Sequence, residues 1–552
     1  MKKVKQLAAL GLSVAMIAGL CACGDNGGQE GSSTPDSGVQ DSSAQESSSQ
    51  DSSQEPSSQE AASNETQESG KPVTLEWWYR GNGVQKDTEM VEDAFNELLQ
   101  TYPGMENVTV HFNCYTGGEY KNSVILAQSA SQQIDILNTV GLDFAEEVEK
   151  GSFLALDDYL SSNEALKGEL PDWLWELGSI DGHTYIVPNY QRAANMMYFI
   201  TPKEYMDKYG DIDAMREVFQ DKDRNVETVA ATLEEYCAAV QAGEGTQKYM
   251  PSLGTSYSTQ YGFMDRYDTI YGKFIKFQDS DKVENIYMTE DILKAYEISA
   301  EWYKKGYVHP DILTISAKDF EGANMMNDIS YIYCMNNQAG DEGSVSQYYS
   351  ETYGFEVCAI PIFTNYYITN TWAAGGNGIT AKCANPDKAM RLIELMTTEE
   401  GTELYNLVVY GIEGTHYEKL DDTHIKTLEY DGTQGGVDAS YAAMKWIMGN
   451  TFHAYLNQGC KDGDNELALE INNATDNDIS DLMGFSANVA DIATQLEQTQ
   501  AVTDEYRMAL ESGAMGDDWK SYYDDYAGKM NNAGLQDILA ALQEQVDTFK
   551  AK

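Results

Sequence analysis

Segments typical of β-strands alternate with segments typical of helices over residues 73–137, and this alternation restricts the fold more than any other feature. Residues 73–79 (VTLEWWY) and 108–115 (VTVHFNCY) are rich in β-branched and aromatic side chains, as strands are. Residues 87–99 place apolar side chains at helical spacing, residues 119–131 predict a second helix, and residues 134–137 (IDIL) predict a short buried strand. This order of elements predicts a parallel sheet covered by helices.

The carboxyl ends of such strands are where a ligand is expected to bind. Side chains alternate along a strand, so Trp77 and Trp78 should point to opposite faces and at most one should reach a ligand. Trp77 shares the face of Leu75, which we expect to be core, and Trp78 is therefore the better candidate. The candidate ligand-binding residues at these strand ends are Trp78, Tyr79, Tyr115 and Asp143.

The N-terminus has the layout of a secretion signal. Three lysines precede an apolar stretch over residues 7–20 that is shorter than the roughly 20 residues a transmembrane helix needs. The stretch ends in Leu20-Cys21-Ala22-Cys23, which resembles the lipobox of bacterial lipoproteins. The resemblance implies that residues 1–22 are removed and that Cys23 is acylated. The alternative is an ordinary cleaved signal followed by two incidental cysteines.

Residues 24–70 predict a disordered tether. They contain Ser, Gln, Glu and Asp with almost no large apolar side chain and no Lys or Arg, so they cannot bury enough surface to offset the entropy of ordering. A flexible chain of about 47 residues spans on the order of 40 Å. We therefore expect residues 23–70 to hold a soluble body away from a membrane to which the lipid on Cys23 anchors it.

The charge of the chain excludes nucleic acid as a partner. The formal net charge is −53, and cleavage before Cys23 removes three more lysines. Nucleic-acid binding needs clustered Lys and Arg, which this composition does not offer. The acidity also argues against a polyanionic ligand, although a local basic pocket can overcome it.

Motifs for catalysis and metal binding are not found. The chain has no G-x-S-x-G, H-E-x-x-H, P-loop or G-x-G-x-x-G pattern, and the six cysteines after Cys23 show no CxxC spacing. Acidic stretches such as residues 221–227 and 462–466 lack the spacing of an EF-hand, so we predict neither a metal nor another cofactor. Paired carboxylates in so acidic a chain keep a secreted glycosidase as the enzyme alternative.

Aromatic and amide side chains in the expected connections favour a sugar ligand. Rings stack on the C–H faces of sugars, and acidic or amide groups bind their hydroxyl rims. The chain has 37 Tyr, 15 Phe and 8 Trp, although each single ring is equally compatible with a core position. Further candidate ligand-binding residues are Tyr190, Trp372, Trp446, Asn450 and Phe452.

Several short motifs in a fixed order resemble family 1 extracellular solute-binding proteins. They include GSFLALDDYL at residues 151–160, IDGHTYIVP at 180–188, YIYCM at 331–335 and PDKAMRLIELM at 386–396. The stretch YNLVVYGIEGTHY at 405–417 and the tail from residue 484 resemble the lipoprotein branch with an extra C-terminal region. The resemblance covers residues 72–549 and marks Glu413 and His416 as polar site candidates, unless this motif is simply a structural turn.

The resemblance implies an α/β fold of two lobes, a type II-like periplasmic-binding-protein clamp in which each lobe is a sheet flanked by helices. We assign residues 72–187 and about 312–362 to the N-terminal lobe. Residues 188–311 and about 363–552 form the C-terminal lobe, including a mainly helical C-terminal region. The connections near Pro188 and Pro361 are expected to act as the hinge.

The function that the resemblance implies is capture of a carbohydrate, in particular an oligosaccharide, for an ABC importer, without catalysis. ABC permease subunits are the expected protein partner, the protein itself is expected to be a monomer, and the outer face of the cytoplasmic membrane of a Gram-positive bacterium is its expected location. A peptide or another small solute on the same scaffold is the alternative cargo.

Overall fold

The structure is a computed structural model. It describes residues 71–245, 248–249, 266–314, 331–335, 345–347, 349–350, 354–369, 375–428, 439–458 and 460–551. The predicted signal, Cys23, the predicted tether and Trp372 lie outside the described residues.

A five-stranded sheet forms the centre of the first lobe, in the strand order β2-β1-β3-β14-β6. Strand β1 pairs in parallel with β2 and with β3, as the sequence predicts, whereas β14 pairs antiparallel with both β3 and β6. The strands are β1 (Val73–Arg80), β2 (Val108–Tyr115), β3 (Ile136–Asn138), β6 (Ile186–Pro188) and β14 (Gly376–Ile379).

Helices cover this sheet and supply much of its core. In α1 the side chains of Val91, Phe95 and Leu99 recur every four residues and are fully buried. The helices of this lobe are α1 (Thr88–Leu99), α2 (Tyr120–Ser129), α3 (Phe144–Glu149), α4 (Asp157–Ser161), α5 (Glu164–Glu169), α6 (Asp172–Leu177), α16 (Pro386–Thr397), α17 (Thr402–Tyr410), α18 (Lys445–Met448) and α19 (Asp464–Asn472). Its smaller elements are β4 (Ser179–Ile180), β5 (His183–Thr184), β15 (Tyr417–Lys419), β16 (His424–Thr427), β17 (Leu456–Asn457), η2 (Glu399–Gly401) and η3 (Thr451–His453).

The second lobe has two antiparallel sheets. Strand β7 lies between β11 and β12 in one of them, and β9 lies between β8 and β10 in the other. These strands are β7 (Met196–Pro202), β8 (Tyr267–Tyr271), β9 (Phe274–Phe277), β10 (Val283–Asn285), β11 (Tyr331–Met335) and β12 (Val357–Pro361). The helices around them are α7 (Lys203–Tyr209), α8 (Ile212–Phe219), α9 (Val226–Glu244), η1 (Ile286–Met288) and α11 (Glu290–Lys305).

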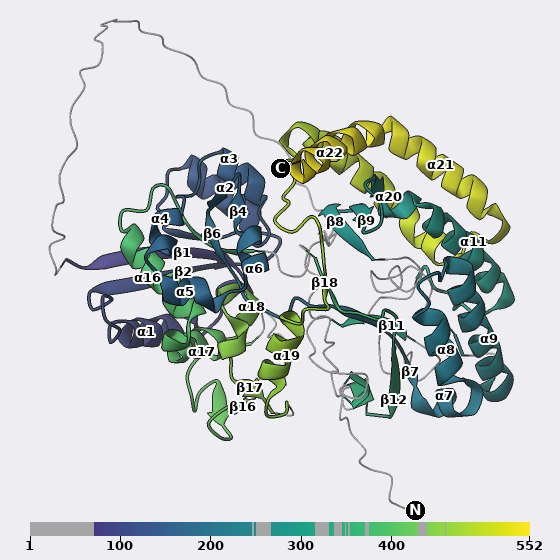
Figure 1. Cartoon of the computed structure of the whole chain (residues 1–552), viewed down its shortest axis with the longest axis horizontal. Coiled ribbons are helices and arrows are strands. Elements are labelled where there is room, and N and C mark those ends of the chain that lie inside the picture. The colour runs from purple at the N-terminus through teal and green to yellow at the C-terminus, as the bar shows by residue number, and fades with distance from the viewer. Residues whose placement is uncertain are drawn as a thin grey trace, which may run out of the picture.

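The C-terminal region is helical and packs on the second lobe, where Figure 1 shows it in yellow beside α11. It comprises η4 (Ala490–Ile492), α20 (Ala493–Glu511), η5 (Gly516–Asp518), α21 (Trp519–Asn532) and α22 (Leu535–Lys550). At Gly513, between α20 and η5, φ is +70° and an added Cβ would lie 2.0 Å from the Ser299 carbonyl oxygen of α11. The close approach of the two segments therefore requires glycine.

The strand pairing corrects the expected lobe boundaries. Residues 331–335 and 357–361, expected in the N-terminal lobe, form β11 and β12 and pair with β7 of the second lobe. Residues 376–472, expected in the C-terminal lobe, contribute β14 and α16–α19 to the first. A strand needs a hydrogen-bonding neighbour, and β14 finds two by inserting between β3 and β6.

The chain passes between the lobes three times, after β6, after β12 and after α19. Strand β13 (Tyr367–Ile368) and strand β18 (Asp478–Ile479) pair in parallel where the second and third crossings meet, between the two bodies of Figure 1. Within β13, Tyr367 belongs to the core of the second lobe and Ile368 to that of the first. The first two crossings lie near Pro188 and Pro361, where a hinge is expected, and a hinge there stays a prediction; the third crossing was not predicted.

Candidate functional site

Buried amide side chains lie at the carboxyl end of β3, beside β14. The Oδ1 of Asn377 accepts hydrogen bonds from Trp77 Nε1 at 3.0 Å and from Asn138 Nδ2 at 3.1 Å. Asn138 Nδ2 also donates to the Ile447 carbonyl oxygen of α18 at 3.1 Å, and Asn377 Nδ2 donates to Asn189 Oδ1 at 3.3 Å. This network holds α18 and the start of the first crossing against the sheet edge.

A second amide fixes the first crossing. The Oδ1 of Asn472 accepts from the backbone N–H groups of Ala193 and Ala194 at 2.9 and 3.0 Å, and its Nδ2 donates to the Gln191 carbonyl oxygen at 2.8 Å. Asn472 ends α19 and is buried. Residues 191–194 are therefore tied to the start of the third crossing.

The aromatic candidates of β1 and β2 are largely core residues in this structure. Trp78 is 2% exposed and stacks on Tyr115 with ring centroids 5.1 Å apart, and Tyr79 is 3% exposed. Trp77 and Tyr79 share the core of Leu75, as the alternation predicts, whereas Trp78 packs in a separate core under α2. Tyr115, at the end of β2, is half-buried. Ligand contact by these side chains stays a prediction.

The candidates from the later connections do come together. Tyr190 packs edge-on against Phe452 with ring centroids 4.9 Å apart, and its backbone pairs with that of Asn450. The Nδ2 of Asn450 donates to Glu169 Oε1 at 3.0 Å, and the same oxygen lies 3.0 Å from His453 Nε2. Trp446, one turn before Asn450, is buried, and its Nε1 has no hydrogen-bond partner among the described residues. This group lies beside the first crossing.

Asp143 caps α3, because its Oδ1 accepts from the Glu146 N–H at 3.3 Å. The other oxygen, Oδ2, is buried and has no hydrogen-bond partner in the part of the chain that the structure describes. Desolvation is the main cause that raises the pKa of this carboxyl to about 6, against the opposing effect of the Glu146 N–H.

Glu413 and His416 belong to a turn and not to the group around Tyr190. Glu413 is exposed, and its Oε2 lies 4.0 Å from Lys419 Nζ. His416 is buried, accepts from the Ile412 N–H at its Nδ1 and lies 3.4 Å from Asp87 through its Nε2. An added Cβ at Gly411 would lie 2.5 Å from His416 Nδ1, so the motif has the close packing of a structural turn.

Three cationic residues at this edge of the first lobe were not among the site residues that the sequence predicts. Arg80 ends β1, and its Nε is buried and finds no hydrogen-bond partner within the described residues. An added Cβ at Gly117 would lie 2.9 Å from that nitrogen, so glycine makes room for the guanidinium. Arg192 lies in the first crossing, and Lys445 begins α18. The available signal was weak: Lys445 directly precedes Trp446, which was a candidate.

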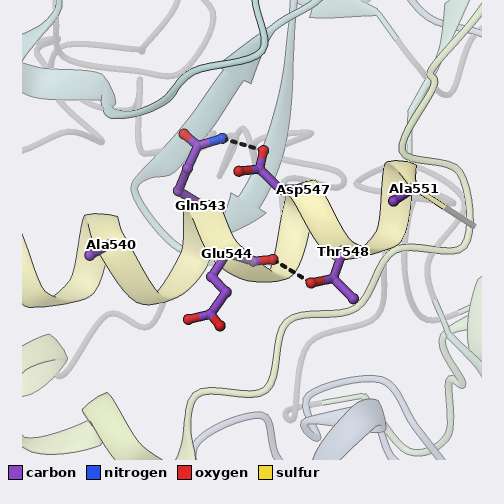
Figure 2. A pocket seen from close by; sticks show the side chains of 6 residues that line it. All are labelled: Ala540, Gln543, Glu544, Asp547, Thr548 and Ala551. Carbon is purple, nitrogen blue, oxygen red and sulfur yellow. Dashed lines mark hydrogen bonds between the residues drawn. The ribbon is translucent and has the colours of Figure 1, made fainter.

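A depression on α22 is unsuited to a small ligand. Figure 2 shows its lining, which comes from one helix face only. The polar groups there satisfy one another: Gln543 Nε2 donates to Asp547 at 2.9 Å, and Thr548 donates to the Glu544 carbonyl at 2.7 Å. Among the described residues its lining comes from this helix alone, whereas a specific site requires groups from several elements to converge.

Within the described part of the chain, no helix combines the length and apolar character needed to cross a membrane. Nor do three or more His, Cys, Asp or Glu side chains gather there in an arrangement that could hold a metal ion.

Known proteins resemble this chain over most of its length. It is 21% identical over 487 residues to a carbohydrate ABC transporter substrate-binding protein of Streptococcus pneumoniae serotype 4, covering 87% of this chain and 92% of the relative. The N-glycan transport solute binding protein NgtS of Streptococcus pneumoniae superposes with a TM-score of 0.65 at 19% identity, over 87% of this chain and 100% of NgtS. NgtS has also been solved in complex with Man1GlcNAc, and this structure superposes with a TM-score of 0.58.

The HMO binding ABC-transporter associated solute binding protein of Bifidobacterium longum infantis superposes with a TM-score of 0.53 at 13% identity, over 87% of this chain and 99% of that one. The chain has the solute-binding protein fold. Residues 481–551 match the family described as Domain of unknown function (DUF3502), which corresponds to the helical C-terminal region on the second lobe. The resemblance to solute-binding proteins and the two-lobed α/β fold that the sequence predicts are thereby confirmed.

Proposed function

We propose that this protein is the substrate-binding lipoprotein of an ABC importer and that it captures an oligosaccharide between its lobes without altering it. The observation that carries the proposal is the likeness to sugar-binding transport proteins over 87% of the chain, both in sequence and in fold. The rings of Tyr190 and Phe452 and the amides around Asn377 are the side-chain types that bind sugar faces and sugar hydroxyls.

Polar contacts between the lobes support a clamp that opens and closes. Asn488 of the C-terminal region donates to Glu149 at the end of α3, and Lys461 of the first lobe donates to Gln347 of the second at 2.8 Å. Because Glu149 and Lys461 are exposed, breaking these bonds costs little free energy. A ligand that touches both lobes would favour the closed state by its differential affinity.

A thermal-shift screen tests the proposal. The mature chain, with Cys23→Ser to prevent acylation, is heated with N-glycan and milk oligosaccharides, monosaccharides and short peptides. We expect saturable stabilisation by an oligosaccharide and no product by chromatography. Stabilisation by peptides alone would replace the sugar with a peptide as cargo, and shortening of the glycan would show a glycosidase.

The proposal includes a lipid anchor on Cys23, the tether of residues 24–70 and delivery to ABC permease subunits by a monomer on the surface of a Gram-positive cell. In cells fed a labelled fatty acid, we expect Cys23→Ala to lose the label and to appear in the medium. The matched control Cys21→Ala should stay labelled in the membrane fraction. Equal labelling of both variants would refute acylation at Cys23.

A further inference from the structure

The chain enters its C-terminal region through residues 481–488, which we name the junction segment and which contacts both lobes. It begins the stretch 481–551 that matches the DUF3502 family, whose helices pack in the core of the second lobe. Within the junction segment, Leu482 and Phe485 belong to that core, whereas Met483 is buried in the core of the first lobe. The C-terminal region therefore meets the other lobe at this segment.

Two further contacts join the junction segment to helices of the first lobe. At Gly484 φ is +81°, and an added Cβ would lie 2.6 Å from the Glu176 carbonyl oxygen of α6. The backbone of the segment therefore lies directly against α6, an approach that requires glycine. The Nδ2 of Asn488 donates to Oε2 of Glu149, the last residue of α3. Because Glu149 is exposed, this bond lies at the surface where the two lobes meet.

The last helix of the chain holds the carboxyl end of the junction segment. The Oε1 of Gln545 in α22 accepts from the Asn488 N–H at 2.7 Å, and its Nε2 donates to the Asn488 carbonyl oxygen at 2.8 Å. One amide side chain thus satisfies both backbone groups of Asn488. Since the backbone of Asn488 is fixed to the second lobe in this way, its side chain can bond to the first lobe.

Ion pairs hold the other end of the junction segment. The Oδ1 of Asp481 accepts from Lys276 Nζ of β9 at 3.0 Å, and its Oδ2 lies 2.7 Å from Lys550 Nζ of α22. The Lys276 side chain is fully buried, and a buried charge needs a paired group of opposite sign. Helix α22 therefore bonds both ends of the junction segment, through Lys550 and through Gln545.

We propose that the C-terminal region is a closure latch, which carries the junction segment on the second lobe and bonds it to the first lobe when the lobes are closed. Opening breaks the bond of Asn488 to Glu149, so the strength of this contact sets the ratio of closed to open molecules. The latch acts on α3, whose N-cap Asp143 is a candidate site residue. The inference rests on the proposed function only in that the lobes open and close.

Single-molecule fluorescence transfer measures the ratio of closed to open molecules in the mature chain with Cys23→Ser and without ligand. One dye is attached at exposed Gln100 of the first lobe and the other at exposed Lys222 of the second. Both are attached through non-natural amino acids, because the chain has free cysteines that would also react with thiol dyes.

Charge changes at Asn488 should shift the ratio in opposite directions. Asn488→Asp removes the donor and places a second carboxylate beside Glu149, so we expect it to lower the ratio of closed to open molecules roughly three- to tenfold. Asn488→Lys pairs with Glu149 and should raise the ratio by a similar factor. Because the two shifts are opposite, one of them is measurable whichever state predominates in the wild type.

Reversing the charge of the partner should reverse both shifts. In a Glu149→Lys background, Asn488→Asp should raise the ratio of closed to open molecules and Asn488→Lys should lower it. A general disturbance of the fold cannot change sign in this way. Gln498→Glu, at an exposed position of α20, also converts an amide to a carboxylate in the C-terminal region and should leave the ratio unchanged.

A pair of glutamines on α22 tests whether the C-terminal helix carries the latch. Gln545→Ala releases the backbone of Asn488 and should lower the ratio of closed to open molecules. Gln543, labelled in Figure 2, makes matched bonds within the second lobe, since it accepts from the Val283 N–H and donates to the Asp281 carbonyl oxygen, both at 2.8 Å. Gln543→Ala should therefore leave the ratio unchanged.

The outcomes separate the latch from the proposed function. If the variants of Asn488 leave the ratio unchanged, or if Glu149→Lys does not reverse their order, the latch is wrong and oligosaccharide capture stands. Equal shifts in Gln545→Ala and Gln543→Ala would also overturn it, because α22 would then have no particular role in closure. A sugar screen without any hit would refute the cargo and leave the latch intact, since this measurement uses no ligand.

Discussion

The hydrogen bond between Trp77 and Asn377 offers a direct test of how the first lobe is held together. The two side chains are 1% and 3% exposed, come from β1 and β14, and are joined by a bond of 3.0 Å. Asn377→Leu keeps the approximate volume of the side chain and removes the acceptor. The indole N–H of Trp77 is then left buried without a partner.

The expected loss follows from the groups left unpaired. An unsatisfied buried N–H costs about 1–3 kcal/mol. Asn138 loses one of its two acceptors but keeps the Ile447 carbonyl, and Asn189 loses a donor, which together add about 1 kcal/mol. We therefore expect Asn377→Leu to lower the free energy of unfolding of the first lobe by about 2–4 kcal/mol.

A double-mutant cycle with Trp77→Phe measures the bond itself. Trp77→Phe removes the donor, so Asn377→Leu should cost at least about 1 kcal/mol less in this background than in the wild type. The free energies come from urea unfolding followed by circular dichroism, with the transition of the first lobe analysed separately because the chain has two cores. Additive effects within about 0.5 kcal/mol would refute the reasoning.

Three further changes test other parts of the structure. Asp143→Asn should stabilise the protein at pH 7. Burial raises the pKa of the Asp143 carboxyl in the folded state to about 6. The stability that protonation of this carboxyl gives is therefore complete below its unfolded-state pKa and is lost as the pH rises through 6. The gain, up to about 2 kcal/mol, should vanish in melts near pH 4, and a pH-independent gain would contradict it. Asn472→Ala deprives two buried N–H groups of the first crossing of their acceptor and should cost about 2–5 kcal/mol, with faster hydrogen exchange at Ala193 and Ala194. Gly513→Ala should release the C-terminal helices, detected as new proteolytic cleavage after α20, whereas Gly528→Ala, where an added Cβ meets nothing within 4 Å, should leave the pattern unchanged.

Local elements of the fold could be predicted from the sequence, but the assignment of segments to lobes could not. Residues 73–79 and 108–115 form β1 and β2 as expected, because the period of two and the β-branched residues are short-range signals. The placement of β14 depends on pairing with β3, and the two asparagines that join these strands are 239 residues apart. The four residues GNGI of β14 carry no pattern that predicts which strand they pair with.

The candidate site also combines features that the sequence predicts with features that only the tertiary structure sets. The sequence by itself determined the signal-like N-terminus, the excess of negative charge and the kinds of side chain at the strand ends, because these depend only on composition and local order. Only the tertiary structure decided which of those side chains are covered, as when the Tyr120 hydroxyl of α2 donates to the Trp78 carbonyl and α2 closes over that ring. It also placed α18, which begins at Lys445, against the end of β3, since the Asn138 side chain donates to the Ile447 carbonyl oxygen and a bond between residues so far apart has no signature along the chain.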